Sequence, residues 1–336
     1  MLEKMFLAAW YGASKWTYVL WPLMLLYRYV VVSKRKAFLV AKNQASINAT
    51  DSGSLSSKVP VIVVGNITVG GTGKTPIVQS LVRYLIINGY TPGIISRGYG
   101  GSLDTFPYLI QAVDSSALVG DEPYMLSHSL GVPVVIDPKR KNALKHIVSL
   151  GVDVVISDDG MQHYELPRDI EICVIDGARG LGNQKLIPVG PLREPLNRLD
   201  SVDFNLESSA ELSNNTFLIE PVSWVNVKTG AGVSLDQFKV DSDAVAIAGI
   251  GNPGKFFNTL KVMGVKCKCV PFSDHHPYTY EDTDKIQGQI LMTEKDSVKI
   301  RPFARDDMWY LEISAKLSDT FYERFAQKLN EHKFTK

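Results

Sequence analysis

The chain has 336 residues, of which 45% are hydrophobic and 21% charged, so it is long enough for two globular domains and too apolar to be disordered. Its formal net charge of +1 argues against a general nucleic-acid-binding protein. The three cysteines are too few for a disulfide framework and lack the companion ligands of a zinc site, which fits a protein of a reducing, cytosolic compartment.

The N-terminal region is the membrane-like part of the sequence. Residues 16–32 are almost entirely apolar or aromatic, and residues 1–40 carry a net charge of +5, which leaves −4 for the remainder. The apolar run is short for a membrane span and is interrupted by Pro22 and Arg28, so it predicts a helix that lies on the membrane surface. The basic residues 34–36 then face anionic headgroups on the cytosolic side. A buried core helix is the alternative.

A phosphate-binding loop follows an expected linker at residues 43–58. Residues 61–64 read as a buried strand, and a glycine-rich turn leads from them to a helix that starts near Lys74. Backbone N–H groups in such a turn converge on an anion, and the helix N-terminus attracts it. Thr68 stands where the Walker A pattern has its first glycine, but the context still predicts the loop. Lys74 is expected to reach the β- and γ-phosphates of ATP, and the Thr75 hydroxyl to bind Mg²⁺.

Strands and helices alternate through the next hundred residues, which is typical of a doubly wound, mostly parallel sheet of the P-loop NTPase type. A domain boundary is expected where Gly and Pro become frequent, just after Asp176. The predicted parts are an N-terminal membrane-associating helix (1–40), a P-loop domain (41–178) and a smaller C-terminal α/β domain (179–336). The strands predicted in the P-loop domain are 61–64, 91–96, 132–136, 152–156 and 170–175, and its helices are 76–88, 122–129 and 142–150.

The C-terminal half predicts a second α/β unit of similar character. A short helix is expected at 195–199, and an amphipathic helix at 317–331 closes the chain. The strands predicted between them are 244–248, 265–271, 289–292 and 308–313, with a helix at 255–263.

Acidic residues stand where strands end and helices begin. Asp158 and Asp159 follow a buried strand, as the Walker B carboxylate does, and we expect one of them to reach Mg²⁺ because adjacent strand residues point in opposite directions. Asp121 begins a helix. It is either a helix N-cap or the group that deprotonates an acceptor hydroxyl, and its position in the sequence leaves both roles open.

Further charged and glycine-rich segments allow more than one interpretation. His275 and His276 are either surface loop residues or members of a His–carboxylate pair for proton transfer. Residues 249–254 resemble the glycine turn of a dinucleotide-binding fold, although Pro253 removes an N–H group from that turn. Residues 293–296 are an exposed charged turn or a contact to the nucleotide base. Arginines near the expected crevice suit phosphate binding, namely Arg97 and Arg193, the latter followed by Glu194.

Taken in order, these segments resemble one family, the tetraacyldisaccharide 4′-kinases, which are the lipid A 4′-kinases. The blocks that carry the resemblance are residues 65–66, 69–76, 96–100, 120–123, 158–163, 190–194, 249–253, 274–276 and 293–296. The aromatic N-terminal helix also resembles the membrane-associating helix of the family. Thr68 belongs to the family pattern, whereas Met161 stands where an aromatic residue is expected.

The resemblance implies ATP-dependent phosphorylation of the 4′-hydroxyl of the tetraacyl disaccharide 1-phosphate precursor of lipid A, at the cytoplasmic face of the inner membrane. It implies a catalytic Asp121 paired with His275, together with Lys74, and it weakens the dinucleotide interpretation. The implied ATP-binding residues are Thr68, Val69, Gly70, Gly71, Thr72, Gly73, Lys74 and Thr75, the implied Mg²⁺ ligands are Thr75, Asp158 and Asp159, and the implied acceptor-binding residues are Asn66, Arg97, Arg193 and Glu194.

The implied partners are the lipid A precursor and the membrane surface, and we expect no nucleic-acid partner and no obligate protein partner. The alternative function is a membrane-associated P-loop NTPase that acts as a regulatory switch and has no small-molecule acceptor.

Overall fold

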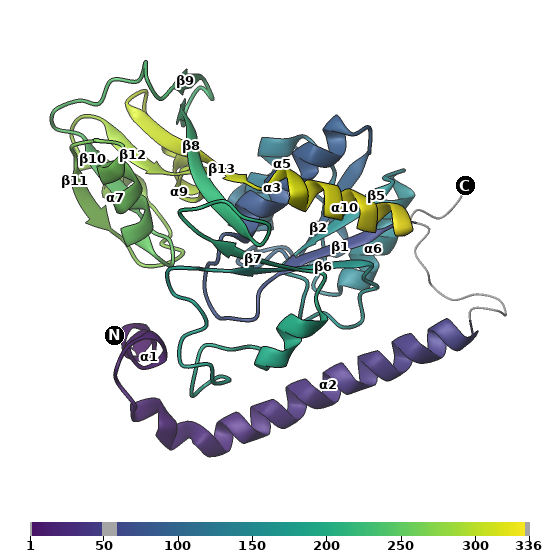
Figure 1. The fold of residues 1–336 in the computed structure, drawn as a ribbon. Helices are drawn as coiled ribbons and strands as arrows, with labels where there is room; N and C mark the ends of the chain where they lie inside the picture. The colour runs from purple at the N-terminus through teal and green to yellow at the C-terminus, as the bar shows by residue number, and fades with distance from the viewer. Residues whose placement is uncertain (1, 49–58, 333–336) are drawn as a thin grey trace.

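The fold is built on one continuous sheet. The computed structural model describes the backbone of residues 2–48 and 59–332 (Figure 1). Within those residues the strands form a 13-stranded sheet in the order β11-β10-β12-β13-β8-β7-β6-β1-β5-β2-β4-β3, with β9 paired to β8. Most neighbouring strands are parallel, so the expected α/β class is confirmed. Two halves meet where β7 pairs with β8 over the short register Glu207–Thr216 and Ser208–Phe217.

The N-terminal lobe contains the half of the sheet from β3 to β7. Its central strand β1 is fully buried between β5 and β6, as expected for a Val- and Ile-rich strand of a parallel sheet covered on both faces. The elements of the lobe are β1 (Val61–Gly65), α3 (Lys74–Ile87), β2 (Pro92–Ser96), β3 (Tyr108–Leu109), α4 (Ser116–Val119), α5 (Asp121–Leu130), β4 (Val134–Ile136), α6 (Arg140–Ser149), β5 (Val154–Asp158), β6 (Ile170–Ile175), the 3-10 helix η2 (Leu196–Ser201) and β7 (Phe204–Ser208).

The C-terminal lobe contains the other half of the sheet. The long strand β8 crosses from the N-terminal lobe and pairs with β13 in antiparallel orientation, while β10, β11, β12 and β13 are parallel. Its elements are β8 (Thr216–Asn226), β9 (Gly232–Ser234), β10 (Val245–Ala248), α7 (Pro253–Val262), β11 (Lys268–Pro271), α8 (Tyr280–Asp284), β12 (Ile290–Thr293), α9 (Glu294–Ile300), the 3-10 helix η3 (Arg301–Phe303) and β13 (Met308–Lys316).

The sequence ranges of the two lobes interleave. The closing helix α10 (Asp319–Glu331) returns to the N-terminal lobe, where Phe321 and Phe325 lie in the same hydrophobic cluster as Ile62 of β1. Strand β7 also belongs to that half of the sheet, because it pairs with β6. Both elements fall in the range 179–336 that we expected to form the C-terminal domain, so we propose lobes defined by the sheet halves and not by one cut near residue 178.

The N-terminal helices lie along one side of the molecule (Figure 1). They are α1 (Leu2–Tyr11), the 3-10 helix η1 (Trp16–Leu20) and the 28-residue α2 (Trp21–Asn48). No helix in the described part of the chain is long and apolar enough to cross a membrane. The buried-helix alternative is wrong, since Leu26 and Tyr29 are 63% and 72% exposed. The linker expected from residue 43 is also wrong as far as residue 48, which is helical; residues 49–58 lie outside the described part.

Three side chains of these N-terminal helices donate hydrogen bonds to backbone carbonyls of the segment 188–193. That segment in turn contacts the loop after β1, since Pro191 accepts a bond from the Val69 N–H and the Arg193 N–H donates to Ile67. The three bonds run from Trp10 Nε1 to the Pro188 oxygen (3.1 Å), from Thr17 Oγ1 to the Val189 oxygen (2.9 Å) and from Tyr27 Oη to the Arg193 oxygen (2.9 Å).

Replacing Phe321 by Ala tests the packing of α10 on the N-terminal lobe. Phe321 is fully buried against Phe204 of β7, with ring centroids 5.1 Å apart, so the cavity should lower the free energy of unfolding by about 3–5 kcal/mol. The exposed neighbour Glu323 is the control, and Glu323→Ala should change that free energy by less than about 0.5 kcal/mol. Urea denaturation measures both, and equal effects would exclude this packing.

Candidate active site

The phosphate loop lies between β1 and α3, as the sequence predicts. Gly70 and Gly73 have φ angles of 105° and 88°, in the left-handed region that favours glycine, and Gly73 is the N-cap residue of α3. The α3 N-terminus has no side-chain cap, so its first N–H groups remain available to an anion. The loop therefore presents backbone donors and a helix N-terminus at one place.

Asn66 holds this loop from within. Its fully buried side chain donates to the Gly70 carbonyl oxygen and to Thr72 Oγ1, both at 3.3 Å. Arg193 lies 3.4 Å from Asn66 Oδ1 and also reaches Asp159 at 3.3 Å. The expected acceptor-binding role of Asn66 therefore stays a prediction, and the contacts show it as a residue that shapes the loop.

The two acids at the end of β5 differ in environment. Asp159, at a φ of 50°, lies 3.3 Å from Lys74 Nζ and 3.3 Å from Arg193. Burial raises its pKa, but Lys74 and Arg193 outweigh burial and hold that pKa at about 2. Asp158 is 1% exposed, and its carboxylate Oδ1 has no hydrogen-bond partner in the described part of the chain. Burial, followed by the charge of Glu122, raises the pKa of Asp158 to about 7.

These oxygens suit Mg²⁺. Oδ1 of Asp158 has no hydrogen-bond partner in the described residues, and the charges of Lys74 and Asp159 act on this carboxylate. Hydroxyl and carboxylate oxygens are the donors that Mg²⁺ prefers. In the described residues no three His, Cys, Asp or Glu side chains are grouped to hold a metal.

Asp121 is not a helix N-cap. Gly120 occupies the N-cap position of α5, and no side chain caps that helix, so the capping role that the sequence left open is wrong. The Asp121 carboxylate Oδ2 lies 3.4 Å from His275 Nδ1 and 3.3 Å from Lys299 Nζ. Burial raises the pKa of Asp121, but His275 and Lys299 outweigh burial, so the net pKa is below its usual range. Asp121 is therefore ionised near neutral pH and can accept a proton.

The two histidines have different partners. His276 Nε2 pairs with Asp282 at 3.2 Å, and its ring packs against Phe272. His275 has a φ of 56°, and its side chain points toward Asp121. Its backbone N–H donates to the Gly249 carbonyl oxygen. The structure therefore brings His275 to the carboxylate, and not its neighbour.

The site lies where the two lobes meet. Asp121 belongs to the N-terminal lobe, whereas His275 and Lys299 belong to the C-terminal lobe. The turn at 249–254 faces the phosphate loop, because a methyl group on Gly251 would lie 4.0 Å from the Gly71 nitrogen. Two hydrogen bonds connect the two lobes nearby. They run from Lys255 Nζ to Asp176 (2.6 Å) and from Arg179 to the Gly251 carbonyl oxygen (3.1 Å).

Two further expected acceptor-binding residues have contrasting positions. Glu194 is fully buried and bonded to Gln162 (2.8 Å), Arg198 (3.2 Å) and Tyr164, so its carboxylate is already satisfied inside the protein. Arg97 is exposed, and its charge helps to lower the pKa of the half-buried His163 to about 4, after burial itself and Arg140. Arg97 therefore lies close enough to His163 and Arg140 for its charge to act on both.

Helix α9 contributes residues that the sequence did not assign. The segment 293–296 is not an exposed turn, because Asp296 is fully buried and accepts from Thr293 Oγ1 at 2.6 Å. Lys299 was missed entirely. Its spacing of four from Lys295 places both ammonium groups on one helix face, which is a signal the sequence does contain.

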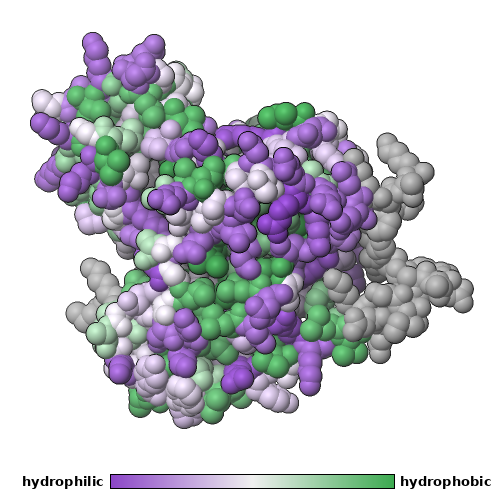
Figure 2. Space-filling view, viewed as in Figure 1, coloured by the Kyte–Doolittle hydropathy of each residue, from purple (hydrophilic) through white to green (hydrophobic). Residues whose placement is uncertain are grey.

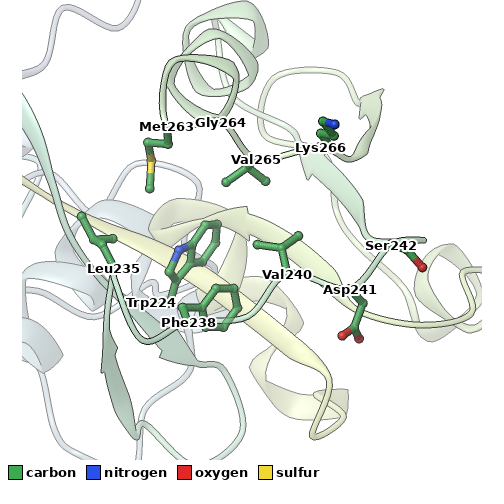
Figure 3. Close-up of a pocket in the computed structure, with 10 residues that line it drawn as sticks. All are labelled: Trp224, Leu235, Phe238, Val240, Asp241, Ser242, Met263, Gly264, Val265 and Lys266. Atoms are coloured by element: carbon green, nitrogen blue, oxygen red, sulfur yellow. The ribbon is translucent and has the colours of Figure 1, made fainter.

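The C-terminal lobe also has a cavity of about 390 Å³, which is separate from this site (Figure 3). Trp224 and Phe238 stack at its base with ring centroids 4.7 Å apart. None of the residues that line it is one of the charged residues described above.

Comparisons with known proteins agree on one family. The family model for tetraacyldisaccharide-1-P 4′-kinase matches residues 16–330. The chain is 43% identical over 327 residues to the tetraacyldisaccharide 4′-kinase of Hahella chejuensis, covering 96% of this chain and 95% of that one. It is 39% identical over 341 residues to that of Vibrio cholerae, covering 98% and 97%.

A solved structure is similar over nearly the whole chain. It is the crystal structure of LpxK from Aquifex aeolicus in complex with ATP, with a TM-score of 0.72 and 27% sequence identity. The similarity covers 95% of this chain and 99% of the other.

Replacing Lys74 by Ala tests the phosphate loop. Loss of one charge-assisted contact costs about 1.5–3 kcal/mol, so ATP should bind roughly 10- to 150-fold more weakly. Isothermal titration calorimetry measures this, with the exposed Lys261→Ala as a control that should leave the dissociation constant unchanged. Equal affinities for the Lys74 variant and the wild type would exclude the assigned role.

Proposed function

The chain belongs to the tetraacyldisaccharide-1-P 4′-kinase family, and we propose which of its residues carry out each part of that reaction. It is an ATP-dependent kinase that phosphorylates the 4′-hydroxyl of the tetraacyl disaccharide precursor of lipid A. The regulatory-switch alternative is not supported, because the relatives are kinases with a small-molecule acceptor. The observation that carries the residue assignment is the Asp121–His275 pair beside the phosphate loop.

The phosphate loop binds the nucleotide. Residues 68–75 supply backbone N–H groups and the α3 N-terminus, and Lys74 exchanges Asp159 for the β- and γ-phosphates of ATP. Thr75, Asp158 and Asp159 are the residues that would hold Mg²⁺, which neutralises phosphate charge when it is bound. Arg193 stays beside Asp159 and keeps that carboxylate in place.

Asp121 accepts the proton of the acceptor. As the 4′-oxygen bonds to the γ-phosphorus, the bond between that phosphorus and the β,γ-bridging oxygen breaks, and ADP leaves with the bond electrons. The hydroxyl proton moves to the Asp121 carboxylate, whose lowered pKa keeps it ionised and therefore able to accept a proton. The Asp121–His275 distance of 3.4 Å is long for a hydrogen bond and is expected to shorten when substrates bind.

The two lobes exclude water during transfer. His275 and the 249–254 turn come from one lobe, and Asp121 and the phosphate loop come from the other, so closure assembles the site and sequesters it. Arg97 and Arg193 are the arginines placed to meet the acceptor near the acids. The buried Glu194 forms an ion pair with Arg198 and so stabilises the segment next to Arg193.

The N-terminal helices place the enzyme on the cytoplasmic face of the inner membrane. Apolar side chains of η1 and α2 are exposed along this side, where Figure 2 shows hydrophobic residues among hydrophilic ones. Such a surface inserts into the headgroup region, while the exposed Lys34 and Lys36 meet anionic lipids. Residues that contribute to it, with their exposed fractions, include Val19 (75%), Leu23 (55%), Leu26 (63%) and Tyr29 (72%).

Replacing Asp121 by Asn tests the base. The kcat should fall about 10²–10⁴-fold, while the KM for ATP changes little, because Asp121 is proposed to act on the acceptor hydroxyl and not on the nucleotide. Transfer of label from γ-labelled ATP to a tetraacyl disaccharide in detergent measures both. A kcat within threefold of wild type would remove Asp121 from the mechanism, and ATP binding without any labelled lipid from the wild type would overturn the kinase function.

Replacing Leu26 by Glu tests the membrane surface. Removing one inserted Leu side chain costs about 1.5–3 kcal/mol, so the bound fraction should fall roughly tenfold or more. Flotation with phosphatidylglycerol–phosphatidylethanolamine vesicles measures it. The control is Ile87→Glu on α3, at a side chain that is 84% exposed but outside the N-terminal helices, and it should float as the wild type does. Binding that resists both Leu26→Glu and high salt would contradict the proposed surface.

A further inference from the structure

Lys295 of α9 lies between the two lobes and contacts both. Its Nζ is 3.1 Å from Glu122 Oε1 of α5 and 3.3 Å from His275 Nε2. The side chain is 19% exposed, so both contacts are partly shielded from water. Lys295 therefore contacts Nε2 of His275, the ring nitrogen that does not pair with Asp121.

The chemistry of an ammonium group decides the direction of the bond to His275. Burial lowers the pKa of Lys295, but Glu122 and other nearby acids outweigh burial and raise it, so Lys295 is charged and has three donors and no acceptor. His275 Nε2 must then be the acceptor and carry no proton. In a neutral imidazole the proton is consequently on Nδ1, which faces Asp121 Oδ2 at 3.4 Å.

We propose that Lys295 is a positioning residue that fixes the Nδ1–H tautomer of His275 and thereby orients the Asp121 carboxylate. The inference rests on the proposed role of Asp121 as base. With Nδ1 already protonated and Nε2 bound to Lys295, His275 has no free nitrogen directed at Asp121. The acceptor proton therefore stops on Asp121, and His275 orients the carboxylate without taking the proton.

The surrounding charges support this arrangement. Asp121 and Glu122 are adjacent acids on α5, and Lys299 and Lys295 face them from α9 at 3.3 and 3.1 Å. Asp274 is the remaining charged neighbour of the ring, with its Oδ1 4.0 Å from Nε2, and it accepts but cannot donate when ionised. The Tyr99 ring meets the imidazole edge, at 5.9 Å between centroids. Lys295 is thus the donor that reaches His275 Nε2 in the described part of the chain.

The tautomer can be measured directly. Nitrogen NMR of the full-length enzyme in detergent, with ¹⁵N-labelled histidine, distinguishes protonated from bare ring nitrogens, and the His275→Gln spectrum assigns the signal among the six histidines. The wild type should show Nδ1–H and a bare Nε2. Lys295→Met, which keeps the chain length but cannot donate, should show an increased Nε2–H form. A wild-type His275 with its proton on Nε2 would overturn the proposal whatever the variants do.

Kinetics provide the second readout. Loss of a partner that orients a metal-bound histidine typically costs about 10–100-fold, and by the same logic Lys295→Met should lower kcat by about that factor with the KM for ATP within about twofold. Lys295→Arg keeps a donor and should restore most of the rate. Lys261→Met, at an exposed lysine of α7, is the matched control and should behave as the wild type.

The outcomes separate this inference from the function on which it rests. If the Asp121→Asn enzyme has a near-normal kcat, the assignment of Asp121 as the base is wrong. If Asp121→Asn is inactive but Lys295→Met keeps its kcat within twofold and keeps the Nδ1–H tautomer, the base stands and the positioning role is wrong. A failure of Lys295→Arg to restore the rate, with normal ATP affinity, also counts against that role.

Discussion

The pairing of Asp121 with His275 is the contact on which the rest of the site depends. It joins the start of α5 in the N-terminal lobe to the loop after β11 in the C-terminal lobe, and Lys299 and Lys295 add two ion pairs across the same boundary. A general base is held in its productive geometry only when the residue that orients it is itself held in place. The two lobes must therefore be together before the acceptor can be deprotonated, which links chemistry to closure and limits phosphate loss to water.

Most of the charged side chains described at this site are paired with an opposite charge. Lys74 and Arg193 share Asp159, while Lys295 and Lys299 take Glu122 and Asp121. An unpaired buried charge is costly, so a site without nucleotide must neutralise the cations that later bind phosphate. Asp159 neutralises the charge of Lys74 in this way. The unpartnered Asp158 oxygen is the exception, and it lies where a cation is expected to bind with the nucleotide.

Local patterns predicted the centre of the N-terminal lobe because β1, β4 and β5 are buried runs rich in Val and Ile that alternate with helices. The sequence did not predict strand β8, because Pro221 and alternating polar residues are unusual in a strand. Residues 216–217 of β8 pair with β7 in the N-terminal lobe, and residues 218–226 pair with β13 in the C-terminal lobe. The return of α10 to the N-terminal lobe and the burial of Glu194 depend on contacts distant in sequence. Asp121 and His275 were candidates from the sequence alone, their catalytic pairing came from the family resemblance, and the partnership with Lys299 required the fold.

The segment 188–193 accepts hydrogen bonds from Trp10, Thr17 and Tyr27 and itself braces the loop after β1. A shortened chain without residues 1–48, attractive for preparing the enzyme free of detergent, would leave these carbonyls without their donors and remove Met24 from its hydrophobic cluster. Such a chain would be more soluble, but its phosphate loop would be less rigidly held. Inhibitor screening on such a fragment would then report on a nucleotide site that differs from the one in the cell.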